Sequence, residues 1–179
     1  MFWLWAPIHF EHHCLHVGLR ERPTGSRWVE MAFHVPHTDR ATRGTPEVRR
    51  LKPGFTYDVE WVPGTREAQR AVFFLEDPVE GPIELAVERV STFRMNGIGY
   101  DHPTWRHGTS HGELDVGRED RHVDEFDPTI VNNMHIQSVV TATAGGERGV
   151  GILENYHLGP HHPTGLTGYT DGWERVDSR

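Results

Sequence analysis

Residues 134–158 read MHIQSVVTATAGGERGVGILENYHL, and this stretch decides the fold. In its first half, side chains alternate in character from Met134 to Val140, as they do along a strand with one buried face. Gly145 and Gly146 then supply the positive φ angles that a two-residue hairpin turn needs. The second half alternates again, so the stretch predicts two antiparallel strands joined by a tight turn.

The same period of two recurs along the rest of the chain. The other expected strands cover residues 1–10, 13–19, 28–35, 55–62, 71–75 and 83–95. Short segments containing Gly and Pro separate them, which is typical of turns. No amphipathic helix of three turns is recognisable, and residues 128–133 fit one short helical turn. About nine strands with little helix predict an all-β, antiparallel, lipocalin-like (calycin-type) barrel, because a sheet of this kind must close or stack to protect its edges.

Length and composition narrow the class of protein. The 179 residues fit one domain spanning residues 1–179, long enough to bury a sizeable core. A net charge of −8 with dispersed arginines argues against nucleic-acid binding. No apolar run approaches the roughly 18 residues of a membrane span, and the apolar start lacks the basic region of a signal peptide. The single cysteine, Cys14, excludes an internal disulfide framework, so a cytoplasmic location is expected.

Two charged residues fall on strand faces that the alternation assigns to the interior. Glu154 shares a face with Ile152 and Tyr156, and Arg89 shares one with Val87. An unpaired buried charge costs several kcal/mol, so a Glu154–Arg89 pair inside a cavity is one solution. The alternative is that the barrel ends flare and both side chains reach water. The neighbouring Asn155 and His157, like His135 and Gln137, are then outward, or line the cavity if the faces are reversed.

Fourteen histidines raise the question of a metal. A cupin-like site would bring together three or more of the following residues: His102, His107, His111, Glu113 and His157. However, the chain has no His-x-His motif of the kind that such a site uses, and no His-Glu-x-x-His motif. The adjacent His12 and His13 would point to opposite faces of a strand. The spacing therefore predicts no metal and no organic cofactor, and Cys14 is expected to be a core residue.

Proton transfer is the second chemistry that histidines suggest, because their pKa lies near neutrality. Residues 100–113 (YDHPTWRHGTSHGE) place many proton carriers beside two aromatic side chains. This segment predicts either the rim of a pocket or a long loop held by its own hydrogen bonds. The chain has no Gly-x-Ser-x-Gly elbow, no phosphate-binding glycine loop and no dinucleotide fingerprint.

Four blocks of sequence resemble one superfamily. They are FWLWAPIHF at residues 2–10, GIGYDHPTWRHG at 97–108 with HGEL at 111–114, GILE at 151–154 and GLTGYTDG at 165–172. Together they resemble the lipocalin-like carotenoid 1,2-hydratase/AttH-type superfamily, in particular an uncharacterised bacterial branch. The resemblance covers nearly the whole chain. It implies that this chain corresponds to the second, C-terminal barrel of relatives that have two.

The resemblance also implies a class of chemistry. Such relatives hold an apolar substrate in a pocket in or between barrels, where acidic groups protonate an alkene. Chemistry and resemblance together nominate the catalytic candidates Glu154, Asp101, His102, His107, His111 and Glu113. The aromatic and cationic candidates for binding the ligand are Trp61, Arg89, Phe93, Tyr100, Trp105 and Tyr156.

Three functions remain open. The first is a barrel that handles a small apolar molecule such as a terpenoid, steroid or aromatic, as a cofactor-free hydratase, dehydratase or isomerase. The second is a barrel that binds a ligand without catalysis, or completes a partner. The third is a cupin-like metalloprotein. A homodimer or a second barrel domain is a further expectation, with the segment Phe2-Trp3-Leu4-Trp5 as its contact face.

Overall fold

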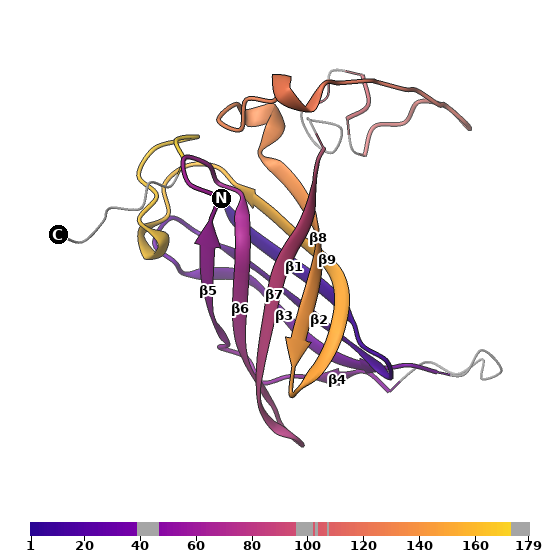
Figure 1. The fold of residues 1–179 in the computed structure, drawn as a ribbon, viewed down its shortest axis with the longest axis vertical. Helices are drawn as coiled ribbons and strands as arrows, with labels where there is room; N and C mark the ends of the chain where they lie inside the picture. Colours follow the sequence, from indigo (N-terminus) through magenta and orange to yellow (C-terminus); the bar gives the residue numbers. More distant parts are fainter. Residues whose placement is uncertain (39–46, 96–101, 103, 107, 173–179) are drawn as a thin grey trace.

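The computed structural model describes residues 1–38, 47–95, 102, 104–106 and 108–172. In these ranges, nine strands form one antiparallel sheet in the order β4-β3-β2-β1-β9-β8-β7-β6-β5. The strands are β1 (Phe2–His9), β2 (His13–Glu21), β3 (Arg27–Pro36), β4 (Arg49–Arg50), β5 (Thr56–Trp61), β6 (Ala68–Asp77), β7 (Gly81–Arg94), β8 (His135–Ala144) and β9 (Glu147–His157). Figure 1 shows the sheet curled into a half-barrel, which confirms the predicted all-β class.

Helix is confined to three short 3-10 turns in the described ranges: η1 (Val123–Glu125), η2 (Val131–Asn133) and η3 (His162–Thr164). The expected turn at residues 128–133 corresponds to η2. The hairpin of β8 and β9 is the one read from the sequence, and Gly145 and Gly146 have φ angles of 56° and 87°. The two-residue strand β4 was not expected, because two residues carry no period.

The chain that follows β4 crosses from one edge of the sheet to the other side of the half-barrel. The Leu51 amide donates to the Ala32 carbonyl of β3 at 2.9 Å, and the Lys52 amide donates to the Glu76 carbonyl of β6 at 2.8 Å. The guanidinium of Arg49 adds an ion pair to the buried Asp77 at 2.7 Å. This crossing joins β3 to β6 at the lower end of the half-barrel in Figure 1.

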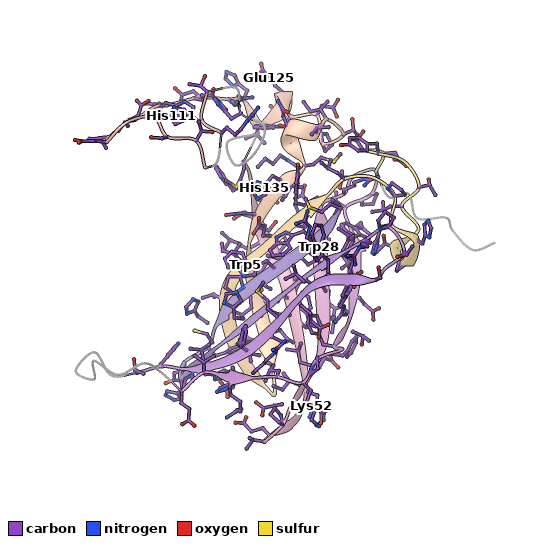
Figure 2. The ribbon with its side chains drawn as sticks, turned by 180° about the vertical axis from the view of Figure 1, so that it is seen from behind. Trp5, Trp28, Lys52, His111, Glu125 and His135 are labelled. Carbon is purple, nitrogen blue, oxygen red and sulfur yellow. The ribbon has the colours of Figure 1, made fainter. Side chains whose placement is uncertain are left out.

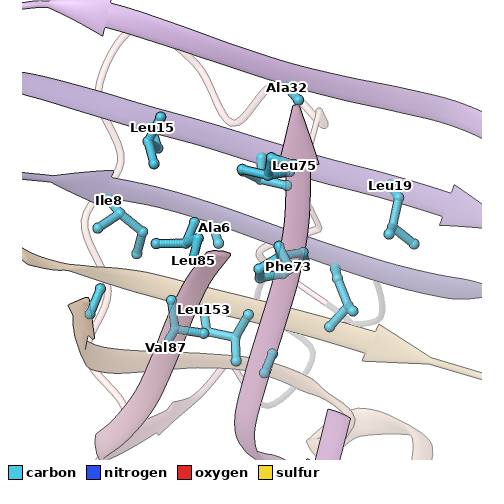
Figure 3. Close-up of a cluster of buried hydrophobic side chains, with 14 of the residues drawn as sticks. Ala6, Ile8, Leu15, Leu19, Ala32, Phe73, Leu75, Leu85, Val87 and Leu153 are labelled. Carbon is cyan, nitrogen blue, oxygen red and sulfur yellow. The ribbon is translucent and has the colours of Figure 1, made fainter. Parts of the chain in front are cut away.

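Hydrocarbon fills the inside of the curled sheet. Leu4, Leu19, Phe73, Leu85 and Leu153 are all at most 1% exposed and belong to one cluster. Figure 3 shows the side chains of this cluster: those of β1, β2 and β9 come from one wall of the half-barrel, and those of β6 and β7 from the other. A core packed in this way stabilises the fold, and it places the openings that a ligand could enter at the rim and on the outer face.

The register of β1 against β9 corrects the expected facing of Glu154. Leu4, which is in the core, pairs with Asn155, whereas Trp5 pairs with Glu154. Residues paired across a sheet share a face, so Asn155 points inward and Glu154 points outward. The prediction of an inward Glu154 was wrong, because both faces of β9 mix polar and apolar side chains.

A bulge in β7 corrects a second expectation. The register against β8 shifts between Arg89 and Ser91, so the strict alternation from Val87 to Phe93 is broken. Arg89 stays on the inner face, opposite Val140, but Phe93 turns outward and is 57% exposed.

The first strand divides the segment that was expected to contact a partner. Phe2 and Leu4 lie in the core, and Trp3 and Trp5 lie half-buried on the outer face. Figure 2 shows Trp5 on β1 and His135 on β8, the two strands that flank β9. Only the two tryptophans of that segment are therefore placed to meet a second copy or a second barrel, which stays a prediction.

Candidate functional site

The hairpin of β8 and β9 brings an acid and an imidazole together on the outer face of the sheet. His135 pairs with Tyr156, and Gln137 pairs with Glu154, so His135 and Glu154 are diagonal neighbours. Their side chains meet at 2.6 Å, between Nε2 of His135 and Oε1 of Glu154. The two side chains are only 8% and 12% exposed. This pair replaces the expected Glu154–Arg89 pair.

A groove of about 470 Å³ opens beside this carboxylate. Its lining residues are Met1, Trp3, Arg20, Val29, Glu154 and Tyr156, from β1, β2, β3, β9 and the residue before β1. Trp3 and Tyr156 pair directly across β1 and β9 and form an aromatic wall. Glu154 lines the groove while His135 stands behind it, so the acid is the group presented to a ligand and the imidazole is its support.

Arg20 brings a cation to the same groove. Its guanidinium lies 4.3 Å from the centre of the Trp28 ring, a cation–π arrangement that orients it. Its Nε is buried and has no hydrogen-bond partner among the described residues. A buried donor without a partner costs about 1–3 kcal/mol. Arg20 lines the groove, so its positive charge lies close to a ligand bound there.

The expected ligand residue Arg89 belongs to a different cluster. This cluster lies at the end of the half-barrel where β6 begins and β7 ends, which we call the inner mouth. Glu67, whose side chain is 3% exposed, accepts hydrogen bonds from Arg89, Thr92 and Arg94. A cavity of about 440 Å³ lies beside this cluster, and Phe93 and Phe126 line it. Arg89 and Phe93 therefore do line one cavity, as expected. However, the carboxylate of Glu67 already neutralises the charge of the two arginines, so the cluster does not need a ligand to compensate it.

The segment around His102 does not form a catalytic rim in its described part. His102 is buried, and its Nδ1 accepts hydrogen bonds from the backbone amides of Thr104 and Trp105. Its Nε2 lies 2.9 Å from the carboxylate of Glu119. Each ring nitrogen thus has a partner within its own loop, which is the structural alternative given above. His111 and Glu113 are exposed. The other candidates of this segment, Tyr100, Asp101 and His107, lie outside the described residues.

The remaining candidates are spread over the molecule. Trp61 is buried at the end of β5 and meets His157 edge-on, with 5.0 Å between ring centroids. Trp105 packs beside His111 at 5.3 Å. Neither lines the groove at Glu154. Of the nominated residues that the structure describes, the groove therefore brings together Glu154 and Tyr156.

Sequence reasoning missed a buried acid on β2. The carboxylate of Glu21 accepts a hydrogen bond from the Tyr57 hydroxyl at 2.7 Å, lies 3.0 Å from Nε2 of His161 and pairs with Arg27. Burial raises the pKa of Glu21, but the hydrogen bonds from these three partners outweigh it and leave the pKa below its usual value. Extending the expected strand 13–19 by two residues would have placed Glu21 on its inner face.

His157 is the second missed group of the interior. It is 1% exposed and stacks on Phe2, with 4.1 Å between ring centroids. Burial in the core, with His161 and Arg66 nearby, holds the pKa of His157 well below its usual value. The ring is therefore neutral at physiological pH. The contact of His157 with Phe2 ties the end of β9 to the start of β1, and the contact of Glu21 with His161 ties the end of β2 to the chain that follows β9.

The cupin-like alternative does not agree with the described part of the chain. His102 and His157 are engaged in the separate contacts above, and His111 and Glu113 point into solvent. A group of potential ligands does occur in the described ranges, but it consists of other residues, His9, Cys14 and His37. In the same ranges, no helix is long and apolar enough to cross a membrane.

Comparison with known proteins gives one family. A family model described as a family of unknown function (DUF8625) matches residues 1–167, which is most of the chain. No curated protein and no solved structure matches the chain. The function therefore has to be argued from the groove itself.

Proposed function

Because the chain belongs to a family of unknown function (DUF8625), we propose its function from its own residues: it binds a small, mainly apolar molecule in the groove at Glu154 and moves a proton on it. One observation carries the proposal. A carboxylate that is about nine-tenths buried lines an aromatic-walled groove and is held at 2.6 Å by His135.

The pair divides the work of a general acid–base catalyst. His135 holds Oε1 of Glu154 in one position, so His135 is the positioning residue. Glu154 faces the groove and exchanges the proton with the ligand. A proton carrier that is fixed beside its substrate contributes about 10²–10⁴-fold to a rate.

The rest of the groove selects the ligand. Trp3, Val29 and Tyr156 offer apolar surface for a hydrocarbon body, and the aromatic faces favour a developing positive charge by about 0.5–2 kcal/mol each. The positive charge of Arg20, which lines the groove, suits a carbonyl or hydroxyl oxygen on that body. These features support a hydratase, dehydratase or isomerase that works without an organic cofactor. The resemblance to the carotenoid 1,2-hydratase/AttH-type superfamily points to the same class.

Binding without catalysis is the second candidate function. It is favoured by the place of the groove, which lies on the outer face of the sheet and not inside the filled half-barrel. A groove of this kind keeps more water beside the acid than an enclosed cavity would, and water weakens the electrostatic effects on which proton transfer depends.

The first experiment is native mass spectrometry of the protein purified from its own host, followed by a binding screen with small enones and terpenoid alcohols. We expect a ligand whose affinity falls about tenfold or more in Trp3→Ala, because the aromatic wall is lost. The matched control is Phe74→Ala, because Phe74 is an exposed aromatic residue of β6 that lies outside the groove lining. Equal binding by wild type and Trp3→Ala would exclude this groove as the site. Proton exchange in Glu154→Gln then separates catalysis from binding.

A further inference from the structure

Three potential metal ligands meet at the far end of the outer face. His9 is the last residue of β1, Cys14 is the second residue of β2, and His37 directly follows β3. His9 pairs with Cys14 across the β1–β2 hairpin, and Cys14 pairs with Val35. His37 lies two residues beyond Val35, so the alternation of the strand brings it back to the same face.

The ligand atoms are at the separations that a small ion requires. Sγ of Cys14 lies 3.0 Å from Nδ1 of His9 and 3.3 Å from Nε2 of His37. All three ligand atoms are within 4.8 Å of one another. In a tetrahedral zinc site, bonds of about 2.3 Å to sulfur and about 2.0–2.1 Å to nitrogen put neighbouring ligand atoms roughly 3.3–3.6 Å apart. Small side-chain adjustments would therefore complete such a site.

The other nitrogen of His37 fixes its tautomer. Nδ1 lies 3.0 Å from the Glu11 carbonyl oxygen, which can only accept a hydrogen bond, so Nδ1 carries the proton. In the neutral ring, the lone pair of Nε2 is then directed at the thiol of Cys14. A backbone carbonyl behind a histidine is the outer-shell support that metal-binding histidines commonly have.

Backbone hydrogen bonds hold the three positions together. The amide of His37 donates to the His12 carbonyl at 2.8 Å, and the Phe10 amide donates to the His13 carbonyl at 2.8 Å. The ligands are thus carried by paired strands and a closed turn. A site built on such a scaffold needs little ordering when an ion enters.

We propose that His9, Cys14 and His37 bind one zinc-class divalent ion, with the fourth position left to water or another small ligand. One thiolate and two imidazoles form a mixed S/N set that suits Zn²⁺ and its spectroscopic substitute Co²⁺. The site lies on the same outer face as Trp5 but four residues farther along β1, which is about 13 Å. It is therefore separate from the groove at Glu154.

The test is a Co²⁺ titration of protein from which any histidine tag has been removed. We expect saturation at one Co²⁺ per chain, with a thiolate-to-cobalt absorption band and the strong visible bands of tetrahedral cobalt, all removed by Zn²⁺. Cys14→Ser should abolish the thiolate band, and His9→Ala and His37→Ala should weaken binding by about tenfold or more. The matched control is His12→Ala, because His12 is 83% exposed and outside the cluster.

A second readout covers variants that fold poorly. In the wild type, Zn²⁺ should protect Cys14 from alkylation, and the twelve histidines outside the site report non-specific binding. An absent thiolate band, unchanged alkylation with Zn²⁺, or equal losses in His12→Ala and His37→Ala would overturn the proposal. Proton exchange at Glu154 does not depend on these outcomes, so the metal site and the proposed function are tested separately.

Discussion

Oε1 of Glu154 lies 2.6 Å from Nε2 of His135, and the two residues are diagonal neighbours across the hairpin of β8 and β9. The outer face of a sheet is usually wet, yet here the carboxylate is only 12% exposed. On that face Trp5 lies directly opposite Glu154 on β1, Tyr156 lies two residues along β9, and His135 contacts its carboxylate. An acid held by an imidazole next to an aromatic groove is the relationship on which the proposed function depends.

Glu67 is predicted to stabilise the inner mouth of the half-barrel. Glu67→Gln removes the negative charge between Arg89 and Arg94, which are 27% and 18% exposed. Leaving two partly buried cations without their carboxylate should lower the free energy of unfolding by about 2–3 kcal/mol. Urea denaturation measures this change. Glu60→Gln breaks an exposed pair with Arg70 and should cost less than about 1 kcal/mol, so equal losses would contradict the assignment.

His157 should make the fold sensitive to mild acid. Its pKa is well below 6.5 in the folded state, where burial keeps the ring neutral, and near 6.5 in the unfolded chain. Below pH 6.5 the unfolded state therefore binds a proton at His157 that the folded state does not bind, and the free energy of unfolding falls as the pH falls. The loss approaches about 1.4 kcal/mol per pH unit for this one group.

The comparison that tests this is the slope of unfolding free energy between pH 7 and pH 5. His157→Gln should flatten the slope, while the exposed His122→Gln should leave it unchanged. A wild-type slope in His157→Gln would show that other groups cause the acid sensitivity. Below about pH 4.5 the depressed pKa of Glu21 adds a further loss in both proteins, because the same sign applies to a carboxylate that is stabilised in its charged form.

Gly151 of β9 lies directly against the backbone of β1. A Cβ at this position would lie 2.2 Å from the Pro7 carbonyl oxygen and 2.8 Å from Cδ1 of Ile8. Gly151→Ala must therefore push the strands apart, and we expect a loss of about 1–3 kcal/mol in unfolding free energy. At Gly18 the nearest atoms are 3.1 Å away and belong to the side chains of Met31 and Trp5, which can move. A larger loss in Gly18→Ala than in Gly151→Ala would contradict this packing.

The strands were predictable because alternation of side chains is a local property. The pair His135–Glu154 was also within reach: once the Gly145-Gly146 turn pairs Ala144 with Glu147, counting back along both strands makes the two residues diagonal neighbours. What alternation cannot supply is which face points inward. On β9 one face carries Asn155 and His157 and the other Glu154 and Tyr156, so composition does not distinguish them.

Contacts between distant parts of the chain could not be predicted from the sequence. The bulge between Arg89 and Ser91 depends on pairing with β8 and turns Phe93 outward. His37 joins His9 and Cys14 only because β3 ends beside the β1–β2 turn. The spacing of the histidines along the chain gives no sign of that meeting, which is why a metal was not expected.

Deuterium exchange tests the central claim most directly. A ligand from the binding screen is incubated with the protein in D₂O, and NMR follows deuterium entering the carbon next to the ligand's oxygen or double bond. We predict exchange with the wild type and a loss of about 10²-fold or more in Glu154→Gln, with binding retained. The exposed Glu84→Gln serves as the control and should exchange like the wild type. Exchange at the wild-type rate in Glu154→Gln would contradict the account.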